Sequence, residues 1–286
     1  MFVKRLISGI CLLVILAVGL VLGGDILLAL GVFISVVGFY EMMRGTGTLG
    51  ETDEKGKGAT GALFLVGVAG IVAYYFLLAL ADGRKLLPEQ VSTQIPMLCV
   101  TAVVIAILVV YVLTFPKYKA EQIMATVFSF VYAPMMLSYI YRTRCLEQGV
   151  YLVWLIFISS WMCDTSAYVV GMLIGKHKMA PKLSPKKSVE GGIGGIVGAA
   201  LLGFVYGLIL KKMGMIEENA LYFYPLIAGV GGLISQIGDL AASAVKRNYK
   251  IKDYGKLIPG HGGILDRFDS VIFTAPIIYY LALLFM

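Results

Sequence analysis

Residues 221–286 read LYFYPLIAGVGGLISQIGDLAASAVKRNYKIKDYGKLIPGHGGILDRFDSVIFTAPIIYYLALLFM. Two apolar runs, 221–245 and 268–286, each approach the roughly 20 residues that a helix needs to cross a bilayer. The segment Ser243–Asp269, which joins them, gathers Lys, Arg, His and Asp side chains. The pattern predicts two membrane helices with a polar site at the membrane surface, where a water-soluble molecule can meet a lipid-borne one.

The composition extends this interpretation to the whole chain. Hydrophobic residues make up 59% of the sequence and charged residues 14%, whereas soluble domains have about 45–50% and about 25%. Seven further stretches qualify, or nearly qualify, as membrane spans: 6–22, 25–43, 59–81, 96–115, 122–141, 150–175 and 190–210. We therefore expect an all-α, polytopic integral membrane protein with about nine transmembrane helices.

No soluble domain is evident, so we expect one membrane domain over 1–286. Helices one to five fill 1–145, and helices six to nine, over 150–286, carry two charged loops at 176–189 and 246–267. With nine spans, 18 of the 24 Lys and Arg residues fall on the side of the N-terminus. Cytoplasmic loops are enriched in Lys and Arg. This places the N-terminus and both charged loops in the cytoplasm and the C-terminus outside.

The net charge of +7 also raises nucleic-acid binding as a possibility. The basic residues are spread over separate loops and form no continuous basic face, so the positive-inside pattern of membrane proteins explains them better. We expect no nucleic-acid partner. The segment 44–58, rich in Gly, Thr and acidic residues, is expected to be a solvated loop.

The approach to the second charged loop carries a polar stripe within an apolar helix. Gln236, Asp239, Ser243, Lys246 and Arg247 follow one another at steps that bring them onto or near one helix face. Such a stripe faces protein or a water-filled cavity and not lipid. A carboxylate inside a membrane is costly unless a cation offsets it. Asp239 is therefore predicted as a metal ligand, with a structural ion pair to Lys246 as the alternative.

The sequence PGHGGILDRFD, from Pro259 to Asp269, predicts a tight turn followed by a helix. Its glycines expose backbone N–H groups that suit phosphate oxygens, and His261 within the turn is a candidate phosphate contact. Asp266 and Asp269 are three residues apart near the helix start. Oxygen ligands without nearby Cys favour a hard cation such as Mg²⁺. Simple helix capping is the alternative role for Asp269.

Two upstream motifs add polar groups. Asp164 in WMCDTSAY lies well inside an apolar run, which indicates either a functional site or a hydrogen-bonding hub between helices. In KLSPKKSVEGG, Ser184–Pro185 predicts a helix cap and first turn. Lys186 and Lys187 would then present paired cations to phosphate, or to lipid headgroups.

The glycines that follow these lysines have a spacing typical of close helix packing. Gly191, Gly195 and Gly198 lie three or four residues apart. No Walker A, GxSxG or HExxH motif is present. We therefore expect these glycines to serve helix packing and not a nucleotide cradle.

The stretch 243–269 resembles the signature of the phosphatidate cytidylyltransferases, the CDP-diacylglycerol synthases. That pattern has Ser, Lys-Arg, Lys-Asp, a small residue, Pro-x-His-Gly-Gly, Asp-Arg and Asp at fixed separations. All its positions are filled here: Ser243, Lys246, Arg247, Lys252, Asp253, Gly255, Pro259, His261, Gly262, Gly263, Asp266, Arg267 and Asp269. The upstream motifs around Asp164 and Lys186 also resemble family motifs, although Ser188 stands where Thr is common.

The resemblance implies transfer of the cytidylyl group of CTP to phosphatidic acid, with CDP-diacylglycerol and pyrophosphate as products. It implies catalysis by Asp239, Lys246 and Asp266 with one or two Mg²⁺ ions. The implied metal ligands are Asp239 and Asp266, assisted by Asp164 or Asp269. The implied substrate-binding residues are Lys186, Lys187, Ser243, Arg247, Lys252, His261, Gly262, Gly263 and Arg267. A bacterial plasma membrane, a cytoplasmic active site and a homodimer also fit the family.

Two alternatives stay open on the sequence. The same architecture could serve a transferase that acts on another membrane lipid. Asp164 and Asp239 could instead line the path of a cation or phosphate transporter, although the chain lacks the repeated halves common in transporters. The sequence does not identify the residues that select cytosine, the acyl-chain preference or the oligomeric state.

Overall fold

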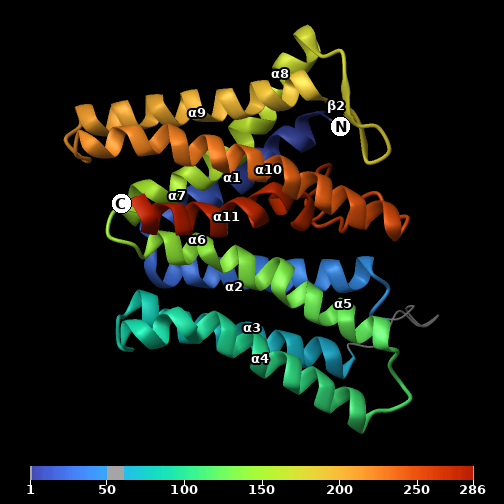
Figure 1. Cartoon of the computed structure of the whole chain (residues 1–286). Helices are drawn as coiled ribbons and strands as arrows, with labels where there is room; N and C mark the ends of the chain where they lie inside the picture. The colour runs from blue at the N-terminus through green and yellow to red at the C-terminus, as the bar shows by residue number, and fades with distance from the viewer. Residues whose placement is uncertain (1, 50–60, 286) are drawn as a thin grey trace. The chain divides into compact units, whose positions relative to one another are not determined.

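A computed structural model describes residues 2–49 and 61–285 (Figure 1). Most of the expected loop at 44–58 therefore lies outside the described residues. Within the described part of the chain, eight helices are long and apolar enough to cross a membrane: Gly24–Gly45, Ala62–Gly83, Glu89–Leu113, Ala120–Arg144, Gly149–Ile174, Val189–Lys212, Ala220–Asn248 and Leu265–Phe285. A shorter apolar helix, Ile7–Leu22, precedes them. The all-α membrane architecture is confirmed, with a helix in each of the nine predicted stretches.

The elements, in chain order, are α1 (Phe2–Leu22), α2 (Gly24–Gly45), α3 (Ala62–Leu78), η1 (Ala79–Gly83), α4 (Glu89–Leu113), α5 (Ala120–Phe130), η2 (Val131–Met135), α6 (Met136–Arg144), α7 (Gly149–Phe157), η3 (Ile158–Met162), α8 (Cys163–Ile174), β1 (Lys178–Ala180), β2 (Ser184–Ser188), α9 (Val189–Lys212), η4 (Asn219–Tyr222), α10 (Phe223–Asn248) and α11 (Leu265–Phe285). Three of the spans contain a π-helical turn, at η1, η2 and η3. Such turns are frequent at functional sites, and η3 ends directly before α8.

One boundary differs clearly from the expectation. The span predicted at 96–115 begins at Glu89, because Pro88 and the acidic Glu89 form a favourable helix start. The polar residues that follow do not prevent helix formation; they only lower the hydropathy of its first two turns. Hydropathy alone therefore placed the start of this helix too late.

The prediction of a helix start at Ser184–Pro185 is wrong. Residues Ser184–Ser188 form strand β2, which pairs antiparallel with β1 in a short hairpin. Helix α9 begins at Val189, and the side chain of Ser188 accepts the N–H of Gly191 at 3.1 Å as its N-cap. Ser188 provides the preferred capping hydroxyl with Glu190 in the first turn, so the helix starts four residues later than predicted.

The chain divides into two compact units. Unit 1 comprises 1–145 and 251–267, and unit 2 comprises 146–250 and 268–286. Each unit contains several membrane helices and part of the signature stretch 243–269.

Unit 1 is built from α1 to α6 and the loop 251–264. Helices α3 and α4 pack side by side (Figure 1). Its core contains fully buried tyrosines whose hydroxyl groups are paired: Tyr75 with Ser35 at 2.7 Å and Tyr74 with Ser138 at 2.8 Å. Paired hydroxyls avoid the cost of unsatisfied polar groups in an apolar interior.

Unit 2 is built around α9, which packs against both α8 and α10 (Figure 1). The predicted glycine packing is confirmed. A Cβ atom at Gly195 would lie 2.9 Å from the carbonyl oxygen of Cys163, and one at Gly198 would lie 2.3 Å from Ser166 Oγ. The absence of side chains on α9 therefore lets α8 approach closely and places Asp164, near the start of α8, beside it.

Candidate functional site

The polar residues of unit 2 meet around one cavity of about 410 Å³. Four of the residues predicted for the site line it: Asp164, Lys186, Lys187 and Asp239. They come from three different elements, α8, β2 and α10. The hairpin that replaced the predicted helix start therefore carries the two lysines to the carboxylates of the membrane helices.

Lys187 is one of the two lysines that line this cavity. Its ammonium group forms an ion pair with Oδ2 of Asp239, and both side chains are about three-quarters buried. The Lys187 nitrogen is buried. Its contact with Asp239 is an ion pair without hydrogen-bond geometry, and no other described residue forms a hydrogen bond with it. An ammonium group has three donors, so this nitrogen is suited to receive an anionic oxygen.

A second ion pair lies deeper in the signature. Lys246 Nζ on α10 lies 4.0 Å from Oδ2 of Asp269 on α11, and both side chains are mostly buried. Asp239 and Asp164 also lie within electrostatic range of the Asp269 carboxylate. The capping role considered for Asp269 does not fit, because α11 begins four residues earlier, at Leu265. Asp269 belongs to the charged group around the unit 2 cavity.

Other residues of the predicted stripe have distinct roles. Gln236 lines the cavity and is buried; its Nε2 donates to the carbonyl oxygen of Gly192 at 2.8 Å, which ties α10 to α9. Ser243 is half-buried and Arg247 exposed in the last turns of α10. Neither of these two residues lines the cavity of unit 2.

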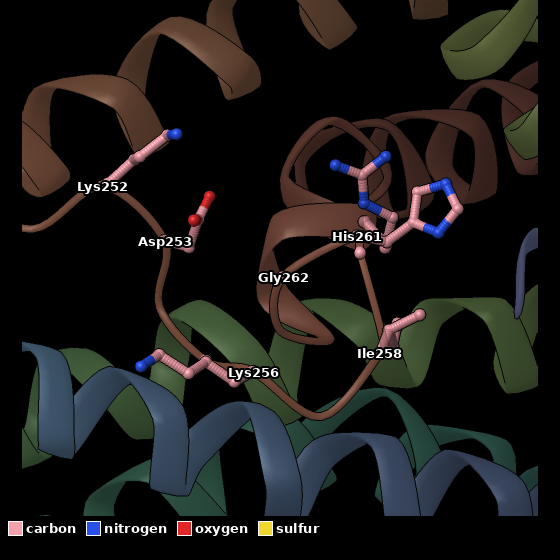
Figure 2. A pocket seen from close by; sticks show the side chains of 9 residues that line it. Lys252, Asp253, Lys256, Ile258, His261 and Gly262 are labelled. Atoms are coloured by element: carbon pink, nitrogen blue, oxygen red, sulfur yellow. The ribbon is translucent and has the colours of Figure 1, made fainter. Parts of the chain in front are cut away.

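A second cavity, of about 600 Å³, lies in unit 1 along the loop between α10 and α11 (Figure 2). Its charged lining consists of Lys252, Asp253, Lys256, His261 and Arg267. Figure 2 shows Lys252, Asp253 and Lys256 on one arm of the loop and His261 on the other. The concentration of basic groups gives this cavity the chemistry of an anion site.

The predicted tight turn is present at its edge. The N–H of Ile258 donates to the carbonyl oxygen of Gly262 at 2.9 Å, and Gly260 and Gly262 have φ of 80° and 88°. Only glycine adopts these values without strain, which explains both positions. His261 Nδ1 lies 2.9 Å from Oγ of Ser8 on α1, and Ser8 Oγ donates to the carbonyl oxygen of Pro259 at 3.0 Å.

Asp266 is 8% exposed, and its carboxylate binds backbone N–H groups of the loop. Its Oδ2 accepts the N–H of Tyr254 at 2.8 Å and the N–H of Gly263 at 3.0 Å. The N–H of Gly263 was predicted to bind phosphate; in the structure it donates to the Asp266 carboxylate. Gly263 and Asp266 do not line the unit 1 cavity, whereas Gly262 does.

Glu41 on α2 is a residue of this region that was not predicted from the sequence. This carboxylate is 3% exposed, and it accepts the N–H groups of Ile264 at 3.0 Å and Leu265 at 2.9 Å, at the start of α11. The signal was available, because an acidic residue near the end of an apolar run is a candidate functional group. It was overlooked because Glu41 lies more than 200 residues from the signature.

Within the described residues, no three His, Cys, Asp or Glu side chains are grouped so as to hold a metal ion unaided. Magnesium is commonly bound by one or two carboxylates together with water and substrate phosphates. Asp164 and Asp239 both line the unit 2 cavity. This donor set fits a magnesium ion that binds together with a phosphate-bearing substrate.

Comparison with known proteins identifies the family of the chain. The family model described as "Cytidylyltransferase family" matches residues 3–285. The phosphatidate cytidylyltransferase of Staphylococcus haemolyticus is 29% identical over 282 residues, 97% of each chain. That of Thermotoga maritima is 32% identical over 214 residues, 72% of this chain and 75% of the relative.

The match to the phosphatidate cytidylyltransferase of Bacillus subtilis is more local. It is 42% identical over 156 residues, 54% of this chain and 56% of the relative. The chain thus spans about half the length of this relative and of one from Staphylococcus saprophyticus. Because the family model covers nearly all of the sequence, the chain belongs to the cytidylyltransferase family of enzymes.

Proposed function

We propose that this protein transfers the cytidylyl group of CTP to phosphatidic acid and releases CDP-diacylglycerol and pyrophosphate. The observation that carries the proposal is the unit 2 cavity, where two membrane carboxylates and a buried lysine meet. The names of the relatives that match the chain support the choice of substrates. A membrane-embedded site suits the reaction, because phosphatidic acid stays in the bilayer.

The chemistry follows from the charges of the reactants. A phosphate oxygen of the lipid, already anionic at neutral pH, attacks the α-phosphorus of CTP, and the bond from that phosphorus to the bridging oxygen of the β-phosphate breaks. The electron pair leaves with pyrophosphate, so no strong general base is required. The barrier comes from repulsion between the anions and from charge that builds on the leaving group. Catalysis therefore requires positioning and charge neutralisation.

The residues of unit 2 suit this task. Lys187 would neutralise a phosphate oxygen with its buried ammonium group, and Lys186 lines the same cavity. Asp239 and Asp164 would hold Mg²⁺, and the carboxyl group of Asp269 lies within electrostatic range of both. When bound, Mg²⁺ would polarise the phosphoryl oxygens and offset their charge. Lys246, which lies beside Asp269, would orient that carboxylate.

The cations of unit 1 suit polyphosphate binding. Lys252, His261 and Arg267 line the loop cavity with Lys256. We assign them the phosphates of CTP, with Gly262 providing close approach of the backbone. We propose that the site faces the cytoplasm of a bacterial plasma membrane, which is supported by the distribution of Lys and Arg and by the bacterial relatives. A homodimer and a second Mg²⁺ remain part of the proposal.

The decisive test is product formation by purified protein in detergent with CTP, phosphatidic acid and Mg²⁺. We expect CDP-diacylglycerol and pyrophosphate in equal amounts, only when all three components are present. Chelation with EDTA should abolish turnover, and added Mg²⁺ should restore it. Asp239→Asn should lose at least about 100-fold in kcat, whereas Asp25→Asn, a substitution of a mostly exposed carboxylate, should retain activity.

The outcomes separate the alternatives. Turnover with a different lipid phosphate, but not with phosphatidic acid, would replace the acceptor and keep the transferase. A folded wild-type protein that releases no pyrophosphate with any lipid, yet moves ions across vesicles, would support the transporter. Full activity in Asp239→Asn would retain the reaction and overturn the metal assignment.

A further inference from the structure

Glu41 on α2 binds the end of the loop 251–264, which lines the unit 1 cavity. Its two carboxylate oxygens each accept one backbone N–H, from Ile264 at 3.0 Å and from Leu265 at 2.9 Å. These are the residues at which the loop ends and α11 begins. The first N–H groups of a helix have no partner within the helix, so Glu41 supplies from α2 an acceptor that α11 itself lacks.

Two glycines of the signature are shaped around the same carboxylate. A Cβ atom at Gly255 would lie 2.1 Å from Glu41 Oε1, and one at Gly263 would lie 2.4 Å from it. Neither Gly255 nor Gly263 has a positive φ. Space for Glu41, and not backbone conformation, therefore explains why these two positions are glycine.

Glu41 and Asp266 act on the loop together. Asp266 accepts the N–H groups of Tyr254 and Gly263, so the two carboxylates bind four backbone N–H groups on both arms of the loop. Lys252, Lys256 and His261 lie on these arms and line the cavity. The position of each cation therefore depends on hydrogen bonds that the carboxylates accept.

We propose that Glu41 is a positioning residue for substrate binding: its carboxylate fixes the loop 251–264 so that the cations of the unit 1 cavity are set for a triphosphate. This inference rests on the proposed function for the identity of the ligand. A carboxylate is required and not only a side chain of this size. In Glu41→Gln one backbone N–H would face the amide NH₂, a donor opposite a donor.

The test compares Glu41→Gln with Glu217→Gln, a substitution of an exposed glutamate between α9 and η4. We expect Glu41→Gln to raise the KM for CTP about tenfold, through the loss of one charge-assisted hydrogen bond, with kcat within about threefold of wild type. The KM for phosphatidic acid should stay near wild type, while the thermal unfolding midpoint should fall slightly because one buried hydrogen bond is lost. Glu217→Gln should match wild type in all four values.

A coupling experiment separates positioning from unrelated damage. Gly255→Ala should also raise the KM for CTP, because its methyl group displaces the carboxylate of Glu41. If both variants act through this contact, Glu41→Gln combined with Gly255→Ala should be no worse than the poorer single variant. A double variant in which the two losses multiply would overturn the proposal, as would an unchanged KM for CTP in Glu41→Gln.

Amide hydrogen exchange keeps the test independent of activity. In Glu41→Gln, exchange in a peptide that covers 254–265 should be faster than in wild type, while exchange in α3 should be unchanged. An inactive but folded wild type would remove the proposed function and leave this comparison valid. Unchanged exchange over 254–265 would overturn the role of Glu41 whatever the activity.

Discussion

At the scale of single residues, Lys187 combines burial, charge and a position beside Asp239. Lys187→Ala removes a cation whose nitrogen is suited to bind an anionic oxygen, so we expect a loss of at least about 100-fold in kcat. Lys182→Ala is the matched control, because this lysine lies exposed in the same hairpin turn and does not line the cavity. Equal activity in the two variants would show that Lys187 serves only as a structural partner of Asp239.

The contact between His261 and Ser8 predicts that Ser8 affects CTP binding. Ser8 Oγ lies 2.9 Å from Nδ1 of His261 and 3.0 Å from the carbonyl oxygen of Pro259, so this hydroxyl links the ring to its own turn. Ser8→Ala removes the hydroxyl that orients the ring. We expect the KM for CTP to rise about fivefold, the value of one ordinary hydrogen bond.

The comparison for Ser8→Ala is Thr93→Ala, which removes an exposed hydroxyl that bonds only to a carbonyl of its own helix. His261→Ala should have at least the effect of Ser8→Ala, and adding Ser8→Ala to it should change little further. If His261→Ala loses CTP binding while Ser8→Ala binds CTP as wild type does, the ring is oriented by other contacts.

At the scale of elements, the packing of α8 on α9 controls the position of Asp164. A Cβ atom at Gly198 would lie 2.3 Å from Ser166 Oγ, two residues after Asp164. Gly198→Val should therefore separate the helices, lower the thermal unfolding midpoint and cost about 1–3 kcal/mol of stability. Gly229→Ala is the control, because its new methyl group would meet Ala200 Cβ at an ordinary 3.4 Å.

Rescue would localise the effect of this packing. Gly198→Ala should be milder than Gly198→Val, and Ser166→Gly should restore much of its unfolding midpoint by removing the side chain it meets. Thermal unfolding in one detergent and lipid mixture provides the measurement. If Gly198→Val unfolds at the same temperature as Gly229→Ala, the glycine face of α9 does not determine helix packing.

The difference between predicted and observed elements has a physical cause. Apolar length alone locates the membrane helices, because hydrophobicity over about 20 residues is a local property. The hairpin Lys178–Ser188 was missed because a short strand pair leaves no periodic pattern, and Ser184–Pro185 imitates a helix start. Lys186 and Lys187 were nevertheless predicted as site residues, because that prediction rested on their charge and not on secondary structure; both line the unit 2 cavity.

At the scale of the whole molecule, long-range contacts were the hardest to predict. The spacing of Asp266 and Asp269 predicts two carboxylates on one helix face, one for Mg²⁺ and one as a helix cap. Instead, Asp266 accepts backbone N–H groups of unit 1, and Asp269 pairs with Lys246 in unit 2. Helical spacing fixes neighbours on one helix but not what another segment brings to them. Glu41 is the same problem over a longer distance, because nothing near it in sequence indicates the loop it supports.

The orientation of the chain in the membrane depends on all of its spans together. If α1 and the eight candidate spans all cross the membrane, Lys182 and Lys256 lie on the cytoplasmic side with the N-terminus, and Lys85 and Lys212 lie outside. Single substitutions Lys182→Cys, Lys256→Cys, Lys85→Cys and Lys212→Cys can be labelled with a membrane-impermeant maleimide, with wild type as background.

In intact cells, only the cysteines at 85 and 212 should be labelled, and in inverted vesicles only those at 182 and 256. Because the apolar segment Ile7–Leu22 of α1 is shorter than the eight candidate spans of the described residues, α1 is the crossing on which the parity depends. If α1 stays on one side of the membrane, the loop cysteines keep their labelling and the N-terminus moves to the outside. Labelling of 182 and 256 in intact cells would contradict the proposed cytoplasmic site, since CTP could not reach it from within the cell.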